Sequence, residues 1–426
     1  MKRIFLFCSC LLTAYVVGAQ PTLDECRRLA REHYPEIRQY DLIRQTKEYT
    51  LSNANKSWIP QIAFAAQATW QTAVPTLPDA LTGMLSQQGV AIPGINKDQY
   101  KIALELNQTI WDGGKTKADK RIAEAEAEEQ NRATDVDFHT LEGRVDNLYF
   151  GILLLDERVR QTRLTIELLR SNLEKVRSLQ RNGVAMQTDA DAVEAELLTV
   201  GQQLTQIEAS RASYRQMLEI FIGKELGGQP LILPDTEQPV SYDNARPELA
   251  LFDAKIEKLT AQEKLVKAST RPRFGLFAQG YYGYPGMDFF ESMMSSDWSW
   301  NAMIGVKMSW NFGAYYTKKN SLNKLRTAKR QVDVQREVFL FNTQLQTTAE
   351  NGDIARLRKA LADDDRIVAL RRSVREAAEA KLRNGVIDTN DLLRKITDEA
   401  TAATARSARE IELAKIICEL KHTINR

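Results

Sequence analysis

The sequence predicts a mostly α-helical protein with four β-strands that face a membrane, built as two tandem repeats in one chain. Three observations predict this fold class: two very long helical stretches without proline, four short segments whose hydrophobicity alternates residue by residue, and an Arg-Asn-Gly-Val turn that occurs twice. Side chains repeat every 3.6 residues in a helix and every two in a strand, so these patterns distinguish the elements.

The first nineteen residues have the features of a signal peptide. Lys2 and Arg3 form a charged start, an apolar run follows over residues 4–17, and Gly18 and Ala19 belong to a small-residue cleavage site. Cleavage there makes Gln20 the first residue of the mature chain. We therefore expect the mature protein to leave the cytoplasm.

Charge and cysteine content exclude two classes of protein. The chain has 58 basic and 56 acidic side chains, whereas proteins that bind nucleic acids usually carry a basic face, so no nucleic-acid partner is expected. Cys26 and Cys418 are the cysteines of the mature chain, too few for a disulfide framework. A disulfide between them would require the two ends of the chain to meet, and we expect instead that both are free and buried. The mature chain has no run of eighteen apolar residues and so no predicted transmembrane helix.

Three landmarks recur in the same order about 200 residues apart, which indicates a duplication. They are "HYPEIRQYDLI" against "ARPELALFDAKI", "IWDGGKTKADK" against "SWNFGAYYTKK", and the two "RNGV" turns. The first repeat is expected over residues 20–223, a linker over 224–246 and the second repeat over 247–426. Each repeat runs helix, two strands, a long helix, a turn and a return helix.

The long helices have a coiled-coil pattern. The first is expected over about 115–181 and its return helix over about 186–222; the second over about 315–383, with a return helix over about 388–423. At about 1.5 Å per residue, the first long helix alone measures roughly 100 Å. Its apolar residues alternate spacings of three and four, with one interruption at Thr162: Leu141, Val145, Leu148, Ile152, Leu155, Val159, Ile166, Leu169, Leu173 and Val176.

Strands are expected over about 60–72, 98–112, 272–284 and 297–313, where apolar and polar residues alternate. The intervening stretch 73–97 is expected to be a loop. Segments of about ten residues with one apolar face and aromatic ends are typical of transmembrane barrels. The aromatic residues predicted to lie at the membrane interface are Trp70, Tyr100, Trp298, Trp300 and Trp310.

Four strands are too few to form a closed transmembrane barrel, since the smallest have eight. An open edge in lipid leaves backbone groups without hydrogen bonds. Several chains must therefore contribute strands. Two chains give eight strands and a filled interior, whereas three give twelve and an aqueous lumen, so we expect a homotrimer. A soluble sandwich would need more strands than one chain has.

The two "RNGV" turns are expected at the far tips of helical hairpins that cross the periplasm. Gly183 and Gly385 would take the left-handed conformation that ends a helix. Asp189 and Asp391 follow near the start of each return helix, where negative charge is favoured.

The duplicated plan, the "WDGG" junction between strand and helix, and the twin "RNGV" turns resemble the TolC-like outer-membrane efflux proteins over about residues 20–426. The resemblance implies a homotrimeric duct, with a twelve-stranded β-barrel in the outer membrane and a twelve-helix tunnel in the periplasm. Such ducts join an inner-membrane pump of the RND or ABC type through a periplasmic adaptor, the membrane fusion protein.

The resemblance also implies roles for particular residues. The linker 224–246 would lie in the equatorial region of the tunnel. Asp391 matches the first acidic position of the periplasmic aperture, and Arg394 stands where a second acid often lies, which is a departure from the family's pattern. The residues implied to dock the adaptor are Arg181, Asn182, Gly183, Val184, Arg383, Asn384, Gly385 and Val386.

Two other classes of function fit the sequence less well. An enzyme is not expected, because His33, His139 and His422 are scattered and no nucleophile has a base at a motif spacing; no cofactor or metal is expected either. A trimeric coiled-coil stalk or adhesin would need one long helix per chain, whereas strands interrupt this chain twice. The expected function is passive efflux of substrates supplied by a pump, with type I protein secretion as the alternative.

Overall fold

The computed structural model describes residues 21–89, 92–227, 230–235 and 243–425. The predicted signal peptide and part of the predicted linker lie outside the described residues. The chain forms two compact units. The helical unit contains residues up to 38, 134–247 and 338 onward, and the sheet unit contains residues 39–133 and 248–337. Each unit takes residues from both predicted repeats, so the division into repeats rests on the sequence landmarks and stays a proposal.

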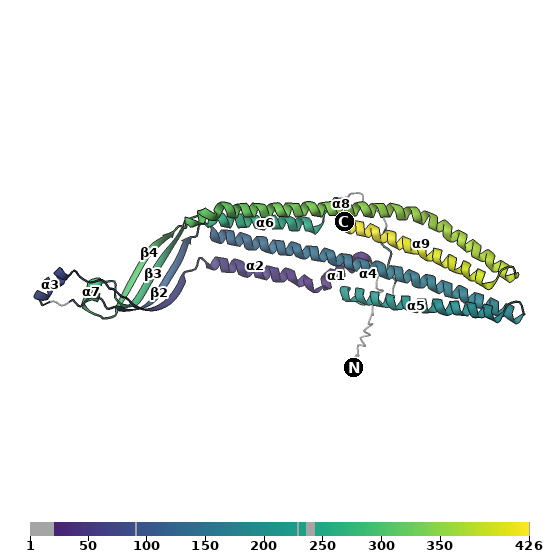
Figure 1. Cartoon of the computed structure of the whole chain (residues 1–426), viewed down its shortest axis with the longest axis horizontal. Coiled ribbons are helices and arrows are strands. Elements are labelled where there is room, and N and C mark those ends of the chain that lie inside the picture. Colours follow the sequence, from purple (N-terminus) through teal and green to yellow (C-terminus); the bar gives the residue numbers. More distant parts are fainter. Residues whose placement is uncertain (1–20, 90–91, 228–229, 236–242, 426) are drawn as a thin grey trace, which may run out of the picture. The chain divides into compact units, whose positions relative to one another are not determined.

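The elements follow one another as Figure 1 labels them. The helical unit holds α1 (Leu23–His33), a short 3₁₀ turn (Pro35–Arg38), α5 (Gln187–Ile222) and α9 (Thr389–Ile424). The sheet unit holds α2 (Gln39–Lys56), β1 (Gln61–Trp70), α3 (Asp79–Gln87), β2 (Asp98–Trp111), α6 (Pro247–Ala268), β3 (Arg273–Tyr284), α7 (Phe289–Met294) and β4 (Ser299–Ser309). Two long helices, α4 (Lys115–Arg181) and α8 (Gly313–Arg383), contribute residues to both units.

No helix in the described part of the chain combines the length and the apolar character needed to cross a membrane.

The four strands form one antiparallel sheet in the order β1-β2-β3-β4. The register places Phe64 opposite Leu104 and Ala278 opposite Ile304, so the apolar positions of all four strands share one face. Polar positions share the other face. There Gln279 accepts a hydrogen bond from Lys101 Nζ at 2.9 Å and donates one to Glu105 at 2.6 Å.

The "WDGG" junction turns the chain from β2 into α4. Gly113 and Gly114 have φ angles of +72° and +87°, which favour glycine. The Asp112 carboxylate accepts the backbone N–H groups of Gly114 at 2.8 Å and Thr116 at 2.6 Å. Asp112 therefore caps the otherwise unpaired donors at the start of α4.

The expectation that residues 73–97 form only a loop was wrong, because this stretch contains α3. The connection between β3 and β4 contains α7. Ile95, Tyr284 and Met293 form a small buried core shared by the two connections. The helix thus lies within a segment that packs against residues about 200 positions away, which local sequence cannot show.

The core of the helical unit gathers around α4. Val145, Tyr149 and Ile152 are fully buried there against α1, α5 and α9. The Tyr149 hydroxyl lies 2.6 Å from the carbonyl oxygen of Ile232, so it fixes the described part of the linker on the helices. Cys26 and Cys418 are both buried in this core and both free.

Candidate docking tips and membrane face

The first tip, residues 182–186, connects α4 to α5. Gly183 has a φ of +71°. Its N–H donates to the Gln180 carbonyl at 3.0 Å, and the Val184 N–H donates to the Leu179 carbonyl at 2.9 Å. This pair of bonds is the Schellman motif, which satisfies carbonyls at the end of a helix.

The second tip, residues 384–388, has the same backbone. Gly385 has a φ of +67°. Its N–H donates to the Leu382 carbonyl at 3.0 Å, and the Val386 N–H donates to the Lys381 carbonyl at 2.9 Å. The two "RNGV" sequences therefore form the same turn, because each places a glycine at the position that needs a positive φ.

The two return helices start differently. At the first tip, the Asp189 carboxylate accepts the Met186 N–H at 2.8 Å. At the second tip, Asp388 is the N-cap, and its carboxylate accepts the Asp391 N–H at 2.8 Å. Asp388 was not singled out from the sequence, although an Asp at the start of a predicted helix is a capping signal.

Each tip presents apolar side chains to solvent. Val184 is 65% exposed, Met186 73% and Val386 68%. Arg181 and Arg383, at the ends of α4 and α8, are exposed beside them. Arginine and methionine are enriched in protein interfaces relative to the rest of the surface, and each tip carries an exposed arginine beside exposed apolar side chains.

The tips are positioned by a shared core and by ion pairs. The core, from Ile166 to Val200 and from Ala378 to Ile396, draws buried residues from α4, α5, α8 and α9. At the level of this core, Glu379 on α8 pairs with Lys175 on α4 and with Arg375. Burial raises the pKa of the Glu379 carboxyl, but hydrogen bonds from Lys175 and Arg375 outweigh this effect and hold its pKa below the ordinary value.

The two predicted aperture residues lie on the first turns of α9. Both Asp391 and Arg394 are exposed. The part of this chain that the structure describes holds no ion pair between them. Their charges are therefore available to groups outside the chain.

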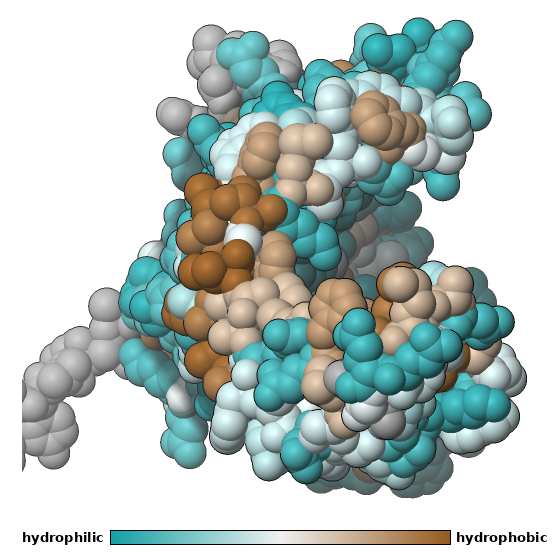
Figure 2. All heavy atoms as spheres, turned by 90° about the vertical axis from the view of Figure 1, so that its left-hand side faces the viewer, coloured by the Kyte–Doolittle hydropathy of each residue, from teal (hydrophilic) through white to brown (hydrophobic). Residues whose placement is uncertain are grey.

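The predicted interface aromatics lie at both ends of the sheet. At the end near α3 and α7, Trp70 is 69% and Trp300 82% exposed, and Tyr100 stacks on Trp298 with ring centroids 5.9 Å apart. At the helix end, the Trp310 indole N–H donates to the Thr270 carbonyl at 3.1 Å. Viewed from the α3 and α7 end, Figure 2 shows apolar side chains gathered in a patch on one side.

Trp111 joins this second group of aromatic residues, although it was not named from the sequence. A register shift after Thr109 places Trp111 opposite Phe274, on the apolar face, with ring centroids 5.9 Å apart. The signal was present, because Trp111 matches Trp310 in the duplicated landmark.

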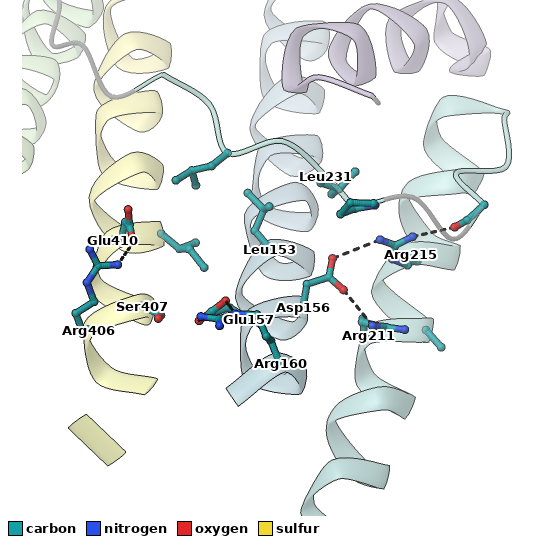
Figure 3. A pocket seen from close by; sticks show the side chains of 15 residues that line it. Leu153, Asp156, Glu157, Arg160, Arg211, Arg215, Leu231, Arg406, Ser407 and Glu410 are labelled. Carbon is teal, nitrogen blue, oxygen red and sulfur yellow. Dashed lines mark hydrogen bonds and ion pairs between the residues drawn. The ribbon is translucent and has the colours of Figure 1, made fainter. Parts of the chain in front are cut away.

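The cavity in Figure 3 lies between α4, α5, α9 and the described linker, and measures about 640 Å³. Asp156 pairs with Arg211 at 3.2 Å and with Arg215 at 3.3 Å. Arg215 also donates to the Gly227 carbonyl at 2.9 Å. These contacts hold the linker against the helices, so we assign the residues around the cavity a structural role.

Two histidines that are distant in sequence meet in the helical unit. The rings of His139 and His422 stack with centroids 3.7 Å apart. Burial, and the neighbouring His139, lower the pKa of His422 to about 3, so its ring is neutral at physiological pH. Among the described residues, no group of His, Cys, Asp or Glu is arranged to hold a metal ion.

Comparison with known proteins identifies the fold. Residues 27–224 match the family model of outer membrane efflux proteins. No curated protein sequence matches the chain. The solved structure of the outer-membrane channel OprN is similar with a TM-score of 0.70 at 15% identity, covering 95% of this chain and 90% of that one.

Other channels have the same fold. VceC from Vibrio cholerae has a TM-score of 0.69 at 15% identity, covering 94% of this chain and 95% of VceC. CmeC from Campylobacter jejuni has a TM-score of 0.67 at 13% identity, covering 95% and 86%. Residues 27–224 therefore match the outer membrane efflux protein family, and nearly the whole chain has the fold of solved outer-membrane channels.

Proposed function

We propose that this protein is the outer-membrane exit duct of a tripartite efflux system. Three copies form a channel that passively conducts substrates delivered by an inner-membrane pump through a periplasmic adaptor. The observation that carries this proposal is the sheet, which has one exposed apolar face and two edge strands, β1 and β4.

The edges favour assembly with further copies. An edge strand in lipid leaves its outward N–H and C=O groups without partners, which costs several kcal/mol for each group. Pairing β1 of one chain with β4 of the next removes every edge. Three chains then supply the strands of a twelve-stranded barrel. Each chain also supplies two helical hairpins, so the three chains together form a twelve-helix tunnel.

The apolar face has the height of a bilayer. Trp300 and Trp310 lie near opposite ends of β4. Ten residues at about 3.3 Å each span roughly 33 Å, and a strand tilt of about 40° reduces this to roughly 25 Å. This height equals the usual apolar band of outer-membrane barrels, so the two aromatic groups would mark the two interfaces.

The two tips and the start of α9 would form the periplasmic end of the duct. The first tip with Arg181, and the second tip with Arg383, would contact the adaptor through Val184, Met186 and Val386. Asp391 and Arg394 would line the periplasmic aperture, because their exposed charges lie one turn inside the second tip.

The test is purification from outer membranes in mild detergent, followed by mass determination by light scattering and current recording in planar bilayers. We expect a particle of three chains that gives small, discrete currents. A monomer that stays in solution without detergent would overturn the proposal.

A further inference from the structure

A strongly basic cleft of about 610 Å³ lies between the first turns of α4 and the last turns of α6, within the sheet unit. Six of its lining side chains are basic and one is acidic. The lining residues are Gly114, Lys117, Ala118, Lys120, Arg121, Glu124, Lys264, Lys267, Ala268 and Arg271.

Most of these basic side chains form no ion pair with the residues that the structure describes. Arg121 pairs with Glu124 at 3.4 Å and with Glu257 at 2.5 Å. By contrast, Lys120 donates to the neutral Asn55 side chain, and Arg271 donates to the Gly113 carbonyl at 3.3 Å.

Three exposed lysines of the cleft, Lys117, Lys264 and Lys267, form no ion pair within the described residues. Like charges held this close repel one another, and a bound anion would relieve the repulsion. Arg271 can offer a planar pair of donors to a phosphate, whereas the lysines act as point charges.

The helical positions of the cleft residues indicate which face of the sheet the cleft lies beside. Lys115 and Thr116 line a separate cavity, whose strand residues lie mostly on the polar face, among them Thr109, Gly275 and Lys307. Successive residues of a helix are rotated by about 100°. Lys117, Arg121 and Glu124 therefore lie on roughly the opposite side of α4 from Lys115 and Thr116, which is the side of the apolar face.

The cleft also lies at the level of the interface aromatics. Trp310 donates its indole N–H to the carbonyl of Thr270, the residue before Arg271. Trp111 lies three residues before Gly114, where the cleft begins. Tryptophan at the end of a membrane strand sits at the depth of the lipid headgroups, so the basic side chains begin where the apolar band ends.

We infer that the basic cleft binds the phosphate of an anionic phospholipid in the periplasmic leaflet of the outer membrane. The inference rests on the proposed function, because that function places the apolar face in the membrane and the helices in the periplasm. Lys117, Lys264, Lys267 and Arg271 hold the phosphate, while the acyl chains lie along the apolar face beside Trp111 and Trp310. A lipid bound here in each subunit fixes the depth of the channel in the bilayer.

The test uses the delipidated full-length protein in a neutral detergent. Calorimetric titration measures the Kd for dioctanoyl phosphatidylglycerol, with dioctanoyl phosphatidylcholine and inorganic phosphate as separate ligands. We expect phosphatidylglycerol to bind at least about tenfold more tightly than either of the others. Equal binding of phosphatidylcholine would overturn the inference. Inorganic phosphate that binds as tightly as the lipid would show a free-anion site and overturn the lipid assignment.

A charge-matched pair of variants assigns the binding to the cleft. The triple variant Lys117→Gln, Lys264→Gln, Lys267→Gln should weaken phosphatidylglycerol binding by at least about tenfold. The control carries Lys56→Gln, Lys319→Gln and Lys324→Gln, which remove the same charge from exposed positions of the same unit outside the cleft. Equal loss in both variants would contradict the assignment.

Subunit number and bilayer currents of the same samples separate this inference from the proposed function. Trimers that conduct but show no preference for phosphatidylglycerol would refute the cleft assignment and leave the duct intact. A monomer without currents would refute the duct, and the lipid site with it.

Discussion

Lys175 on α4 and Glu379 on α8 form an ion pair with an N–O distance of 3.2 Å, which links the two helical hairpins close to their tips. Glu379 is 16% exposed and also binds Arg375, which in turn binds Glu399 on α9. A half-buried network of this kind holds one hairpin against the other close to the two tips.

Replacing Lys175 by Ala should loosen the second tip. A partly exposed ion pair contributes about 1 kcal/mol or less, so backbone amides of residues 384–391 should exchange with solvent up to about fivefold faster. Hydrogen-exchange mass spectrometry measures this. Arg177→Ala is the control, because Arg177 pairs with Glu194 inside the first hairpin. Equal acceleration at the second tip in both variants would mean that the pair does not couple the hairpins.

Alanine at Gly183 or Gly385 should destabilise the protein by about 1 kcal/mol each. No atom lies within 4 Å of an added Cβ at either position, so the whole cost comes from the positive φ. Gly201→Ala is the matched control, since it is equally open but lies inside α5. There alanine should stabilise the helix by about 0.5–1 kcal/mol. Chemical denaturation measures the free energy of unfolding, which should fall for Gly183→Ala and Gly385→Ala and rise for Gly201→Ala. Destabilisation by Gly201→Ala would contradict the reasoning.

The sequence predicted a mostly helical fold with four strands, and this prediction is confirmed. It succeeded because each pattern is local: residues from Leu141 to Val176 keep a helical spacing over many turns, and Phe64 and Leu104 lie in segments with a period of two. The positive φ at Gly183 followed from local turn chemistry as well. Patterns that depend on one stretch of chain can be recognised without knowing what packs against it.

Features that join distant residues could not be predicted. His139 and His422 looked scattered, yet their rings stack. The basic cleft combines Lys117 with Lys264 across two helices that meet only in the fold. Helix α3 lies in a segment that had been assigned to a loop. For the histidines and the cleft the deciding interaction is tertiary, and no local propensity encodes it.

The half-buried His422 should make the protein less stable in acid. Its pKa is about 3 in the folded protein and near 6.5 when unfolded. Below about pH 6.5 the unfolded chain therefore binds a proton that the folded chain does not, and stability falls as the pH drops toward 3. His422→Phe keeps a ring against His139 and removes the titrating group. This variant should lose less stability between pH 6.5 and 4, measured by denaturation at each pH. The exposed His33→Gln is the control and should behave like the parent protein; an unchanged pH profile in His422→Phe would contradict the prediction.

A charge on the apolar face of the sheet should prevent membrane insertion, whereas the same charge one residue away should not. Ile304 is 81% exposed in the middle of β4 and shares its face with Ala278, while Met303 lies opposite Gln279 on the polar face. An arginine at the centre of the lipid-facing band costs about 2–4 kcal/mol in each subunit, and a lumen-facing one avoids this cost. Fractionation of cells that express each variant should therefore find Met303→Arg in the outer membrane as heat-resistant trimers, and Ile304→Arg depleted there. If the two variants reach the membrane equally, then the face that carries Ile304 does not contact lipid.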